Sequence, residues 1–321
     1  MLKFREFSEK YIEESVYLAL REYEEECSIV NELPKSDYYE IIYNLLKGMI
    51  DHNLGSVVID NNKVIGFITC YAPINNFFGN VKGAFSPIHG HAAMKENRSY
   101  IYSKLYQHVA DKWVSNGILS HGISVYAHNN TAIEGFFHNG FGLRCVDAIS
   151  MIEDLCLEMN TTNITMEEIT IDKINCLFEL NNNLALHFIK SPTFFPKSIY
   201  SKQEFEKKAL DRKSRFFIAK DTNKVIGFIE IADSGENFTC DDKKTVNICG
   251  AYLSEEYRGG GIFRDLLSYT ATILHEEKYH RCGVDFESIN PTANRFWRKY
   301  FKPYTYSMVR RIDERVLNTR N

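Results

Sequence analysis

The chain has 321 residues, of which 44% are hydrophobic and 13% aromatic, and it carries 38 basic against 42 acidic side chains. This composition excludes a disordered chain, and the length allows roughly two domains of ordinary size. The formal net charge of −4 provides no strong field for nucleic acid or for an anionic membrane. The sequence also lacks the basic stripe of a nucleic-acid reader, so we expect neither partner.

The N-terminal segment, Met1 to Phe7, lacks the apolar region and the cleavage site of a signal peptide. No window approaches the roughly 18 uncharged apolar residues of a membrane span. The eight cysteines are scattered without a CxxC pair, which favours reduced thiols. We therefore expect a cytoplasmic protein.

The first part of the chain alternates between helical and extended patterns. Apolar residues at helical spacing predict one helix over residues 9–27 and another over Tyr38 to Ile50. Two apolar runs, residues 56–60 and 63–68, are joined by the turn-forming pair Asn61-Asn62 and predict a hairpin.

A repeat links the two halves of the chain. Lys63-Val64-Ile65-Gly66-Phe67-Ile68 recurs, at an offset of 161 residues, as Lys224-Val225-Ile226-Gly227-Phe228-Ile229. The same offset pairs Asn129 with Asn290, Ala132 with Ala293, Phe136 with Trp297, Leu105 with Leu266 and Gly122 with Gly283. We interpret this register as a tandem duplication and predict two similar domains, residues 1–158 and 163–321, with the boundary near Asn160 to Asn163.

The segment from Val246 to Phe263 is the chemically most informative stretch. It reads as an apolar strand, a polar turn, three glycines and the start of a helix. Glycines let the backbone approach an anion closely, and the free N–H groups at the start of the helix point to the same place. The segment therefore predicts a phosphate site, and the alternative is a plain glycine-rich connection between a strand and a helix.

Two motifs carry a family resemblance. Arg258, Gly260 and Gly261, followed by an amphipathic helix, resemble the acyl-CoA pyrophosphate loop of the GNAT superfamily of N-acyltransferases. The segment from Asn290 to Trp297 is similar to the Asn-Ala-Tyr signature that follows in the same superfamily. The resemblance implies an α/β fold of two tandem GNAT-type domains, each with a mixed, antiparallel-rich sheet flanked by helices.

The resemblance also implies an activity and a cofactor site. The expected function is an N-acyltransferase that moves an acetyl group from acetyl-CoA to a primary amine of a small molecule or a protein by direct attack. The C-terminal copy would hold acyl-CoA through Ala251, Tyr252, Leu253, Arg258, Gly259, Gly260, Gly261, Ile262, Phe263 and Asn290. The first copy has Asn97-Arg98-Ser99-Tyr100 in place of the glycines, so we expect that it has lost the cofactor.

Two positions depart from the family pattern. Phe263 stands where the loop ends in a small residue, and Trp297 replaces the tyrosine that returns a proton to the thiolate. An indole N–H donates a hydrogen bond but cannot deliver a proton. We predict Tyr300 as the acid in its place. Solvent, Tyr304 and Tyr306 are the alternatives.

The base that accepts the proton of the ammonium is predicted from the strands near the loop. Glu287, at the end of the strand Val284 to Glu287, is the first choice, and Glu230 is the second. The rival hypothesis is an acyl-CoA-binding or regulatory protein without catalysis, motivated by the missing tyrosine and by the degenerate first copy.

Two further segments allow predictions about the second copy and about metals. We expect a strand over Glu167 to Thr170 and helices over Ile171 to Phe188 and Lys202 to Asp211, with a proline-broken loop between the helices that either walls the acceptor site or packs on the core. His89 and His91 have no Cys, Asp or Glu close by, so we expect no metal site.

Overall fold

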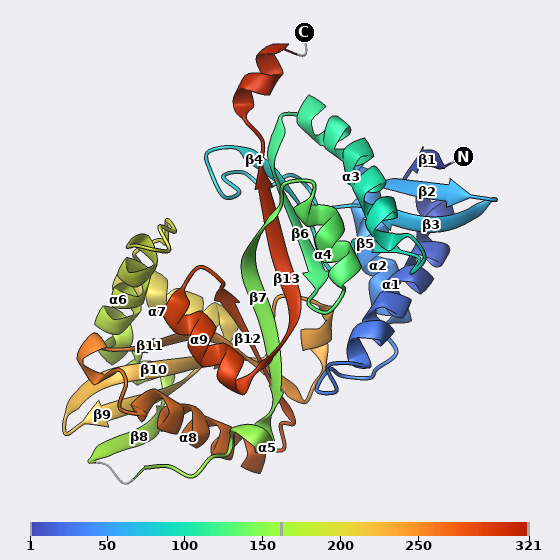
Figure 1. The fold of residues 1–321 in the computed structure, drawn as a ribbon. Coiled ribbons are helices and arrows are strands. Elements are labelled where there is room, and N and C mark those ends of the chain that lie inside the picture. The colour runs from blue at the N-terminus through green and yellow to red at the C-terminus, as the bar shows by residue number, and fades with distance from the viewer. Residues whose placement is uncertain (1, 161–162, 320–321) are drawn as a thin grey trace. The chain divides into compact units, whose positions relative to one another are not determined.

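The computed structural model describes residues 2–160 and 163–319. It divides into two compact units, which are considered separately: unit 1 is Met1–Val146 with Pro303–Asn321, and unit 2 is Asp147–Lys302 (Figure 1). Within the described residues, no helix is both long and apolar enough to cross a membrane.

Unit 2 is built on a mixed sheet. Its strands follow one another across the sheet in the order β8 (Ile164–Ile169), β9 (Arg215–Asp221), β10 (Lys224–Ala232), β11 (Thr245–Leu253), β12 (Arg281–Glu287) and β7 (Gly142–Met151). The strands from β8 to β11 pair antiparallel, whereas β11 and β12 pair parallel. The predicted mixed, antiparallel-rich sheet is confirmed.

Helices cover both faces of this sheet. On one face, Phe205 of α7 (Lys202–Arg212) and Leu180 of α6 (Phe178–Ile189) share a core cluster with Phe216 of β9. On the other face, Phe217 contacts Tyr269 of α8 (Ile262–Glu276), with ring centroids 6.5 Å apart. The short α5 (Ile152–Leu155) and α9 (Pro291–Tyr300) complete the helices of the unit. Adjacent residues of β9 thus separate an α6/α7 face from an α8 face.

The helix boundaries in unit 2 follow local signals. The predicted helix over Ile171 to Phe188 is two elements, the 3-10 helix η3 (Ile171–Leu177) followed by α6. The helix α7 begins with a capping box, in which Ser201 Oγ accepts from the Glu204 backbone N–H at 3.3 Å and Glu204 Oε2 accepts from the Ser201 N–H at 2.8 Å. Further 3-10 turns are η4 (Phe238–Asp241) and η5 (Glu255–Tyr257).

Unit 1 has the same kinds of element in a different sheet arrangement. One sheet has the order β1 (Lys3–Glu6), β2 (Ser56–Asp60), β3 (Lys63–Ile68) and β5 (His91–Ala93). Separately, β6 (Ile118–Tyr126) pairs in parallel with β4 (Lys82–Ser86) and antiparallel with β13 (Lys302–Arg311). The helices are α1 (Ile12–Cys27), α2 (Tyr39–Met49), α3 (Arg98–Ser115) and α4 (Asn130–Phe137), with 3-10 turns η1 (Glu9–Tyr11), η2 (Ile50–His52) and η6 (Glu314–Thr319).

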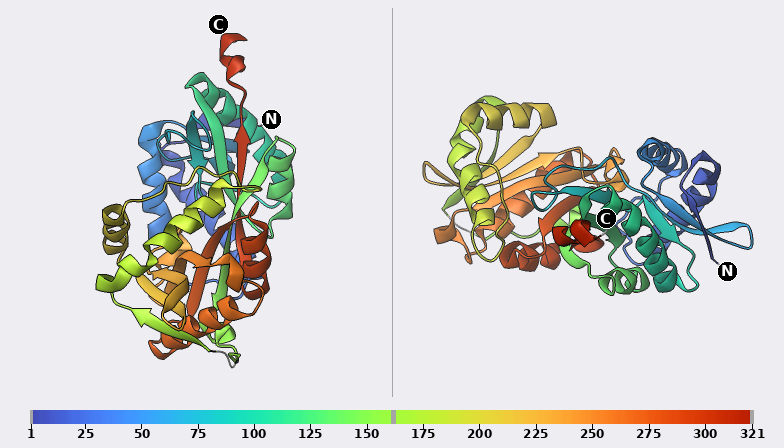
Figure 2. Two further views of the ribbon diagram at one scale, coloured as in Figure 1. Left: turned by 90° about the vertical axis from the view of Figure 1, so that its left-hand side faces the viewer. Right: turned by 90° about the horizontal axis from the view of Figure 1, so that it is seen from above.

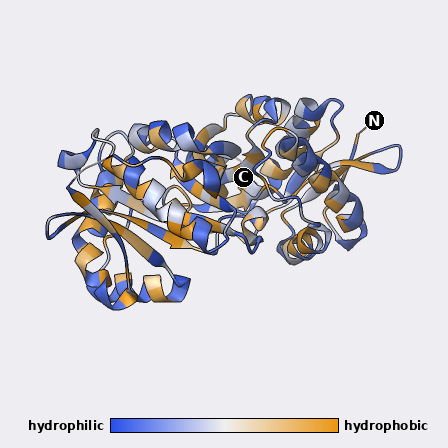
Figure 3. Ribbon diagram, turned by 90° about the horizontal axis from the view of Figure 1, so that it is seen from below, coloured by the Kyte–Doolittle hydropathy of each residue, from blue (hydrophilic) through white to orange (hydrophobic). Residues whose placement is uncertain are grey.

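Local sequence explains the elements of unit 1. The two predicted helices and the predicted hairpin are confirmed as α1, α2 and the β2–β3 pair. Asn61 and Asn62 both have positive φ, 47° and 62°, as a tight hairpin turn of the primed type requires. Trp113, Tyr102 and Phe136 are fully buried in the core of the unit. Hydrophobic and hydrophilic residues mix along the helices, as in amphipathic helices that cover a core (Figure 3).

The last strand of each half of the sequence leaves its own half. From Pro303 onward β13 belongs to unit 1, where Ser307 is paired with Ser124 of β6, while from Asp147 onward β7 belongs to unit 2 (Figures 1 and 2). The compact units therefore do not follow the linear division into residues 1–158 and 163–321, which stays a prediction about the sequence repeat. Of the predicted boundary, residues 161 and 162 lie outside the described residues.

Candidate functional site

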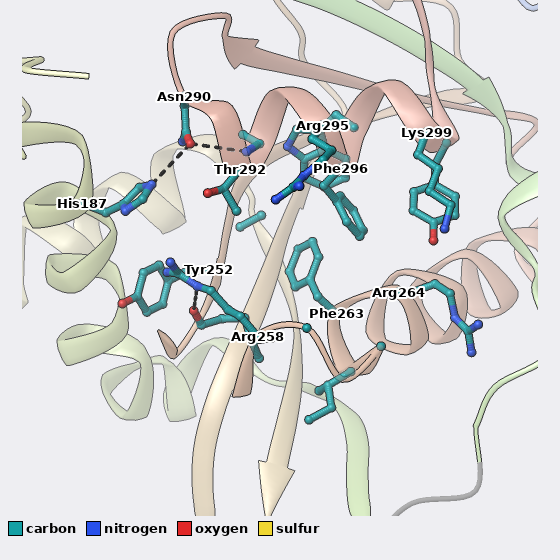
Figure 4. Close-up of a pocket in the computed structure, with 18 of the residues that line it drawn as sticks. His187, Tyr252, Arg258, Phe263, Arg264, Asn290, Thr292, Arg295, Phe296 and Lys299 are labelled. Atoms are coloured by element: carbon teal, nitrogen blue, oxygen red, sulfur yellow. Dashed lines mark hydrogen bonds between the residues drawn. The ribbon is translucent and has the colours of Figure 1, made fainter. Parts of the chain in front are cut away.

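A cavity of about 470 Å³ lies in unit 2 beside the N-terminal end of α8 (Figure 4). Four segments line it: the end of β11, the loop into α8, one side of α9, and the C-terminal part of α6. The lining residues are Leu184, His187, Ala251, Tyr252, Leu253, Arg258, Gly259, Gly261, Ile262, Phe263, Arg264, Asn290, Thr292, Ala293, Arg295, Phe296, Trp297, Lys299 and Tyr300.

The strand β11 reaches the cavity because it separates from β12. The parallel ladder runs from Thr245 opposite Arg281 to Ile248 opposite Val284, and β12 continues to Glu287 beyond that point. At the same place β11 bulges against β10: Ile231 pairs with Ile248 but Glu230 pairs with Gly250, which leaves Cys249 as the extra residue. A bulge bends its strand and ends pairing. We call this separation of β11 from β12 the fork.

The loop that enters α8 is shaped by glycines. Gly259 and Gly261 have φ of 90° and 85°, in the left-handed region that side chains rarely adopt. Gly261 caps α8, and its carbonyl oxygen accepts from the Asp265 N–H at 3.0 Å. The first N–H groups of a helix have no intrahelical acceptor, so those of α8 are available at the cavity for an anion.

Arg258 fixes this loop to the end of β11. Its Nε donates to the Leu253 carbonyl oxygen at 3.0 Å, and its guanidinium lies over the Tyr252 ring, 5.3 Å from the centroid. A weaker ion pair joins its Nη1 to Glu255 Oε1 at 3.8 Å. The Arg258 side chain therefore holds the start of the glycine loop against the end of β11.

Asn290 is the most constrained polar residue of the cavity. It caps α9, because its Oδ1 accepts from the Ala293 N–H at 3.3 Å, and Pro291 follows at the first helical position. The same Oδ1 lies 3.4 Å from His187 Nε2 of α6 (Figure 4). Asn290 is only 5% exposed. It thus joins the start of α9 to α6 at one end of the cavity.

Aromatic rings form the wall between α8 and α9. Phe263 contacts Phe296 and Trp297 edge-on, with centroids 4.9 and 5.8 Å apart. Phe296 in turn contacts Tyr300 at 5.0 Å. The large residue at position 263 therefore packs against α9, and Trp297 is held in this cluster with 5% exposure.

The charge of the cavity favours an anionic ligand. Arg258, Arg264, Arg295 and Lys299 line it, and none of its lining residues in the described part of the chain is acidic. Arg264 is partly neutralised, because its Nη2 lies 2.6 Å from Asp265 Oδ1. Arg295, Lys299 and the helix start remain to meet negative charge, together with Arg258, whose ion pair with Glu255 is long at 3.8 Å.

The structure brings most of the predicted site residues to this cavity. All predicted cofactor-binding residues except Gly260 line it, as does Tyr300. Glu287 does not line it, and its backbone carbonyl accepts from the Asn290 N–H at 3.0 Å. Glu230 is buried and engaged: Ser214 Oγ donates to its Oε1 at 2.6 Å and Arg212 lies 3.6 Å away. The roles of these residues stay predictions.

Sequence reasoning missed several lining residues. The following lining residues were not among the predicted cofactor-binding residues: Leu184, His187, Arg264, Thr292, Ala293, Arg295, Phe296, Trp297 and Lys299. The spacing of the Asn290 motif could have found those on α9, since Thr292, Phe296 and Lys299 recur at helical spacing on one side. His187 had no local signal, because its neighbour Asn290 is distant in sequence.

The corresponding place in unit 1 is filled by its own side chains. Arg98 Nε donates to the Ala93 carbonyl oxygen at 3.1 Å, and α3 begins at Arg98 itself. The carboxylate of Glu22, on α1, accepts from the Ala93 N–H at 2.8 Å, from Tyr102 Oη at 2.7 Å and from Asn129 Nδ2 at 2.8 Å. Glu22 is 5% exposed. The backbone N–H group at the end of β5 thus donates to a carboxylate of the protein itself and is not available to a ligand.

The histidine pair of unit 1 is a packed core element. His89 Nε2 lies 3.1 Å from Tyr71 Oη, and His91 Nδ1 lies 3.0 Å from Ser86 Oγ. Burial lowers the pKa of His89 to about 4 and that of His91 to about 3, so both rings are neutral near pH 7. Over the described residues, no group of three or more His, Cys, Asp or Glu side chains is placed to hold a metal ion.

Comparison with known proteins agrees with this geometry. The model of the acetyltransferase (GNAT) family matches residues 183–301, which include every residue that lines the cavity. A search of curated proteins found no significant match.

Solved structures with a similar fold share little sequence. A GCN5-related N-acetyltransferase from Sphaerobacter thermophilus has a TM-score of 0.60 at 10% identity, covering 97% of this chain and 95% of its own. A GCN5-related glucosamine N-acetyltransferase region of a fungal multi-domain β-N-acetylglucosaminidase scores 0.55 at 12% identity, covering 96% of this chain and 38% of its own. A tandem GNAT protein from the clavulanic acid biosynthesis pathway scores 0.50 at 12% identity, covering 97% and 98%. The chain therefore has the GNAT fold, and its residues 183–301 are a domain of the acetyltransferase (GNAT) family.

Proposed function

We propose that the protein is an acetyl-CoA-dependent N-acetyltransferase that acts on a primary amine of a small molecule or a protein, with the cofactor held by unit 2. The observation that carries the proposal is the cavity at the start of α8, which combines a glycine-shaped helix terminus, basic side chains and the free end of β11. These features suit the pyrophosphate and the extended arm of acyl-CoA.

Different segments of the cavity would bind different parts of acyl-CoA. The N–H groups from Gly259 to Phe263 would hold the pyrophosphate. Beyond the fork, the backbone of Ala251 to Leu253 would pair with the extended arm, and an N–H group there would stabilise the oxyanion. Asn290 would contact the arm from the start of α9. A strand edge without its neighbour is the feature that makes such pairing possible.

The reaction needs a base and an acid. The amine reaches the site as an ammonium ion and must lose a proton before its nitrogen attacks the thioester carbon, and the departing thiolate must gain one. A carboxylate of β12 would accept the proton in the first step, and Glu287 is the residue that the sequence predicts for this role. Tyr300, which lines the cavity, is the proposed donor for the second.

A binding experiment tests the cofactor site. We expect acetyl-CoA to bind the wild type with one equivalent by calorimetry. Gly260 does not itself line the cavity, but it stands between Gly259 and Gly261, which do, so the carboxylate added in Gly260→Glu should repel the pyrophosphate and weaken binding about tenfold or more. Gly260→Gln is the matched control for size. Position 260 suits the test because φ is not positive there and a Cβ meets no atom within 4 Å.

The outcomes separate the hypotheses. No binding to the wild type would overturn the proposal, and two equivalents would show that unit 1 also holds the cofactor. Release of free thiol is then measured with a panel of amines that includes glucosamine, the acceptor named for one structural neighbour. Binding without thiol release across the panel would favour the rival hypothesis of a non-catalytic acyl-CoA-binding protein.

A further inference from the structure

Asp285 occupies a distinctive place on β12. The ladder with β11 ends at Val284, so Asp285 is the first residue of β12 beyond it, at the fork. Val284 and Phe286 are buried, with 5% and 4% exposure, whereas Asp285 between them is exposed. Because side chains alternate along a strand, Asp285 and Glu287 share the face of β12 opposite to these two apolar residues.

The surroundings of Cys249 identify that face. The charged groups that act on the Cys249 thiol include Asp285, Glu230 and Arg212. Arg212 is the last residue of α7, and its Nη1 lies 3.6 Å from Glu230 Oε1. Asp285 is therefore on the α6/α7 face of the sheet, across the fork from the bulged residue of β11.

We propose that Asp285 is the catalytic base, whose carboxylate takes a proton from the acceptor ammonium at the fork, with the acceptor approaching from the α6/α7 face. The assignment rests on the proposed N-acetyltransferase function. The assignment follows from position. The exposed carboxylate stands where β11 and β12 part, and Ala251, the first residue of β11 that lines the cavity, is three residues beyond Ile248, the last residue paired with β12.

The electrostatics of the fork suit this role. Desolvation and, after it, the carboxylates of Glu236 and Asp147 raise the pKa of Asp285 to about 7; because the residue is exposed, the two neighbouring carboxylates are the causes that its position supports best. The Lys197 ammonium, from the loop before α7, acts in the opposite direction. A base with a pKa near the working pH combines a useful ionised fraction with a useful affinity for the proton.

The proposed step balances. The ammonium of the acceptor transfers one proton to the Asp285 carboxylate and becomes a neutral amine. The nitrogen lone pair forms the bond to the thioester carbon, the C–S bond breaks, and the thiolate leaves with the electron pair. The second proton of the nitrogen is lost as the amide forms and is balanced by protonation of the thiolate. The products are the amide, the free thiol and one proton that Asp285 returns to water.

Two other carboxylates compete for the role. Glu230 is 5% exposed, the Ser214 hydroxyl donates to its Oε1 and Arg212 lies 3.6 Å from the same oxygen, so it is less accessible to an acceptor than Asp285. Glu287 lies two residues further along β12 on the same face, at the end of the strand. It is the alternative that the experiment must distinguish.

The test compares three variants. Thiol release from acetyl-CoA is measured for wild type, Asp285→Asn and Glu287→Gln, with Asp211→Asn as a control at an exposed carboxylate of α7. With the best alkylamine of the panel near pH 7, we expect Asp285→Asn to lower kcat about 100-fold while acetyl-CoA affinity is unchanged. The loss should shrink at high pH, where the amine is already neutral. It should also shrink with hydroxylamine, which is uncharged at neutral pH.

Each outcome decides between the proposals. If the wild type binds acetyl-CoA but releases no thiol with any amine, the proposed function fails and the base assignment falls with it. If the wild type turns over and Asp285→Asn matches it, only the assignment of Asp285 is overturned. A loss in Asp285→Asn that is equal at all pH values and with hydroxylamine would indicate a structural role. A pH-dependent loss confined to Glu287→Gln would assign the base to Glu287.

Discussion

Arg98 and Arg258 make the same hydrogen bond, each from Nε to the carbonyl oxygen of the residue five positions earlier, at 3.1 and 3.0 Å. Their surroundings differ. Arg98 is 4% exposed and its Nη1 lies 2.6 Å from Glu25, whereas Arg258 lies over the Tyr252 ring at the cavity. In unit 1 the helix begins at this arginine, and in unit 2 a glycine loop intervenes. The same arginine hydrogen bond thus accompanies a closed helix start in one unit and a glycine loop beside the cavity in the other.

Glu22 is expected to stabilise unit 1 through its buried contacts. Replacing it by Ala leaves the Ala93 N–H and Asn129 without their acceptor and removes one partner of buried Arg98, so we expect the free energy of unfolding to fall by about 3 kcal/mol. Glu22→Gln keeps an oxygen acceptor and should lose less, about 1–2 kcal/mol. Urea unfolding followed by Trp113 fluorescence in a Trp297→Phe background measures unit 1. Exposed Glu24→Ala is the control, and an equal loss there would contradict the prediction.

Asn290 and Asn129 allow a matched comparison of one cap in two units. Each caps a helix, Asn290 through the Ala293 N–H and Asn129 through the Ala132 N–H at 3.1 Å. We expect either change to Ala to cost about 1 kcal/mol or more of stability, because the cap is lost. Only Asn290→Ala should weaken acetyl-CoA binding in calorimetry. Weakened binding in Asn129→Ala would instead implicate unit 1 in the cofactor site.

His91 is expected to make unit 1 sensitive to acid. Its pKa is lowered by burial, and further by His89, to about 3 in the folded protein, against about 6.5 in the unfolded chain. As pH falls from about 6.5, His91 binds a proton in the unfolded state but not in the folded state. The free energy of unfolding therefore falls by up to about 1.4 kcal/mol per pH unit. His91→Asn cannot titrate. Its unfolding free energy should therefore fall less steeply than that of the wild type between pH 6.5 and 4, and parallel slopes would refute the prediction.

Tyr300 is expected to affect turnover rather than binding. If its hydroxyl returns a proton to the thiolate, Tyr300→Phe should lower kcat by about 100-fold with little change in acetyl-CoA affinity, because the ring still packs against Phe296. A loss of thiol release of about this size, with acetyl-CoA binding retained in calorimetry, would agree with this role. The control is Tyr306→Phe, a tyrosine on β13 that the sequence left as an alternative, and a loss confined to Tyr306→Phe would move the acid there.

The fold and the conformation of the glycine loop were accessible to sequence reasoning because their signals are local. Glycines at 259 and 261, an Asn at 290 followed by Pro291, and the Asn61-Asn62 turn each specify backbone geometry within a few residues. The repeat offset extended these signals to the first half of the chain. Its register was one residue off at the loop, where Arg98 rather than Asn97 matches Arg258 in its hydrogen bond.

The features that sequence reasoning missed depend on contacts between distant segments. Glu22 lies 71 residues from Ala93 and 107 from Asn129, so nothing near Glu22 announces that its carboxylate will fill the end of β5. The fork needs a bulge at Cys249, and Asp285 gains its surroundings from Glu236 and Asp147 on other segments. Charge and exposure of this kind follow from the fold and not from spacing.

The assignment of β13 to unit 1 has a consequence for synthesis. Residues from Pro303 onward supply the antiparallel partner of β6 over Thr305 to Arg311, so unit 1, most of which is translated before unit 2, stays incomplete until this strand has been made. Unit 2, which closes with the earlier strand β7, has all its residues available sooner. A stop codon after Lys302 would therefore remove a strand of unit 1 and leave every residue of unit 2 in place.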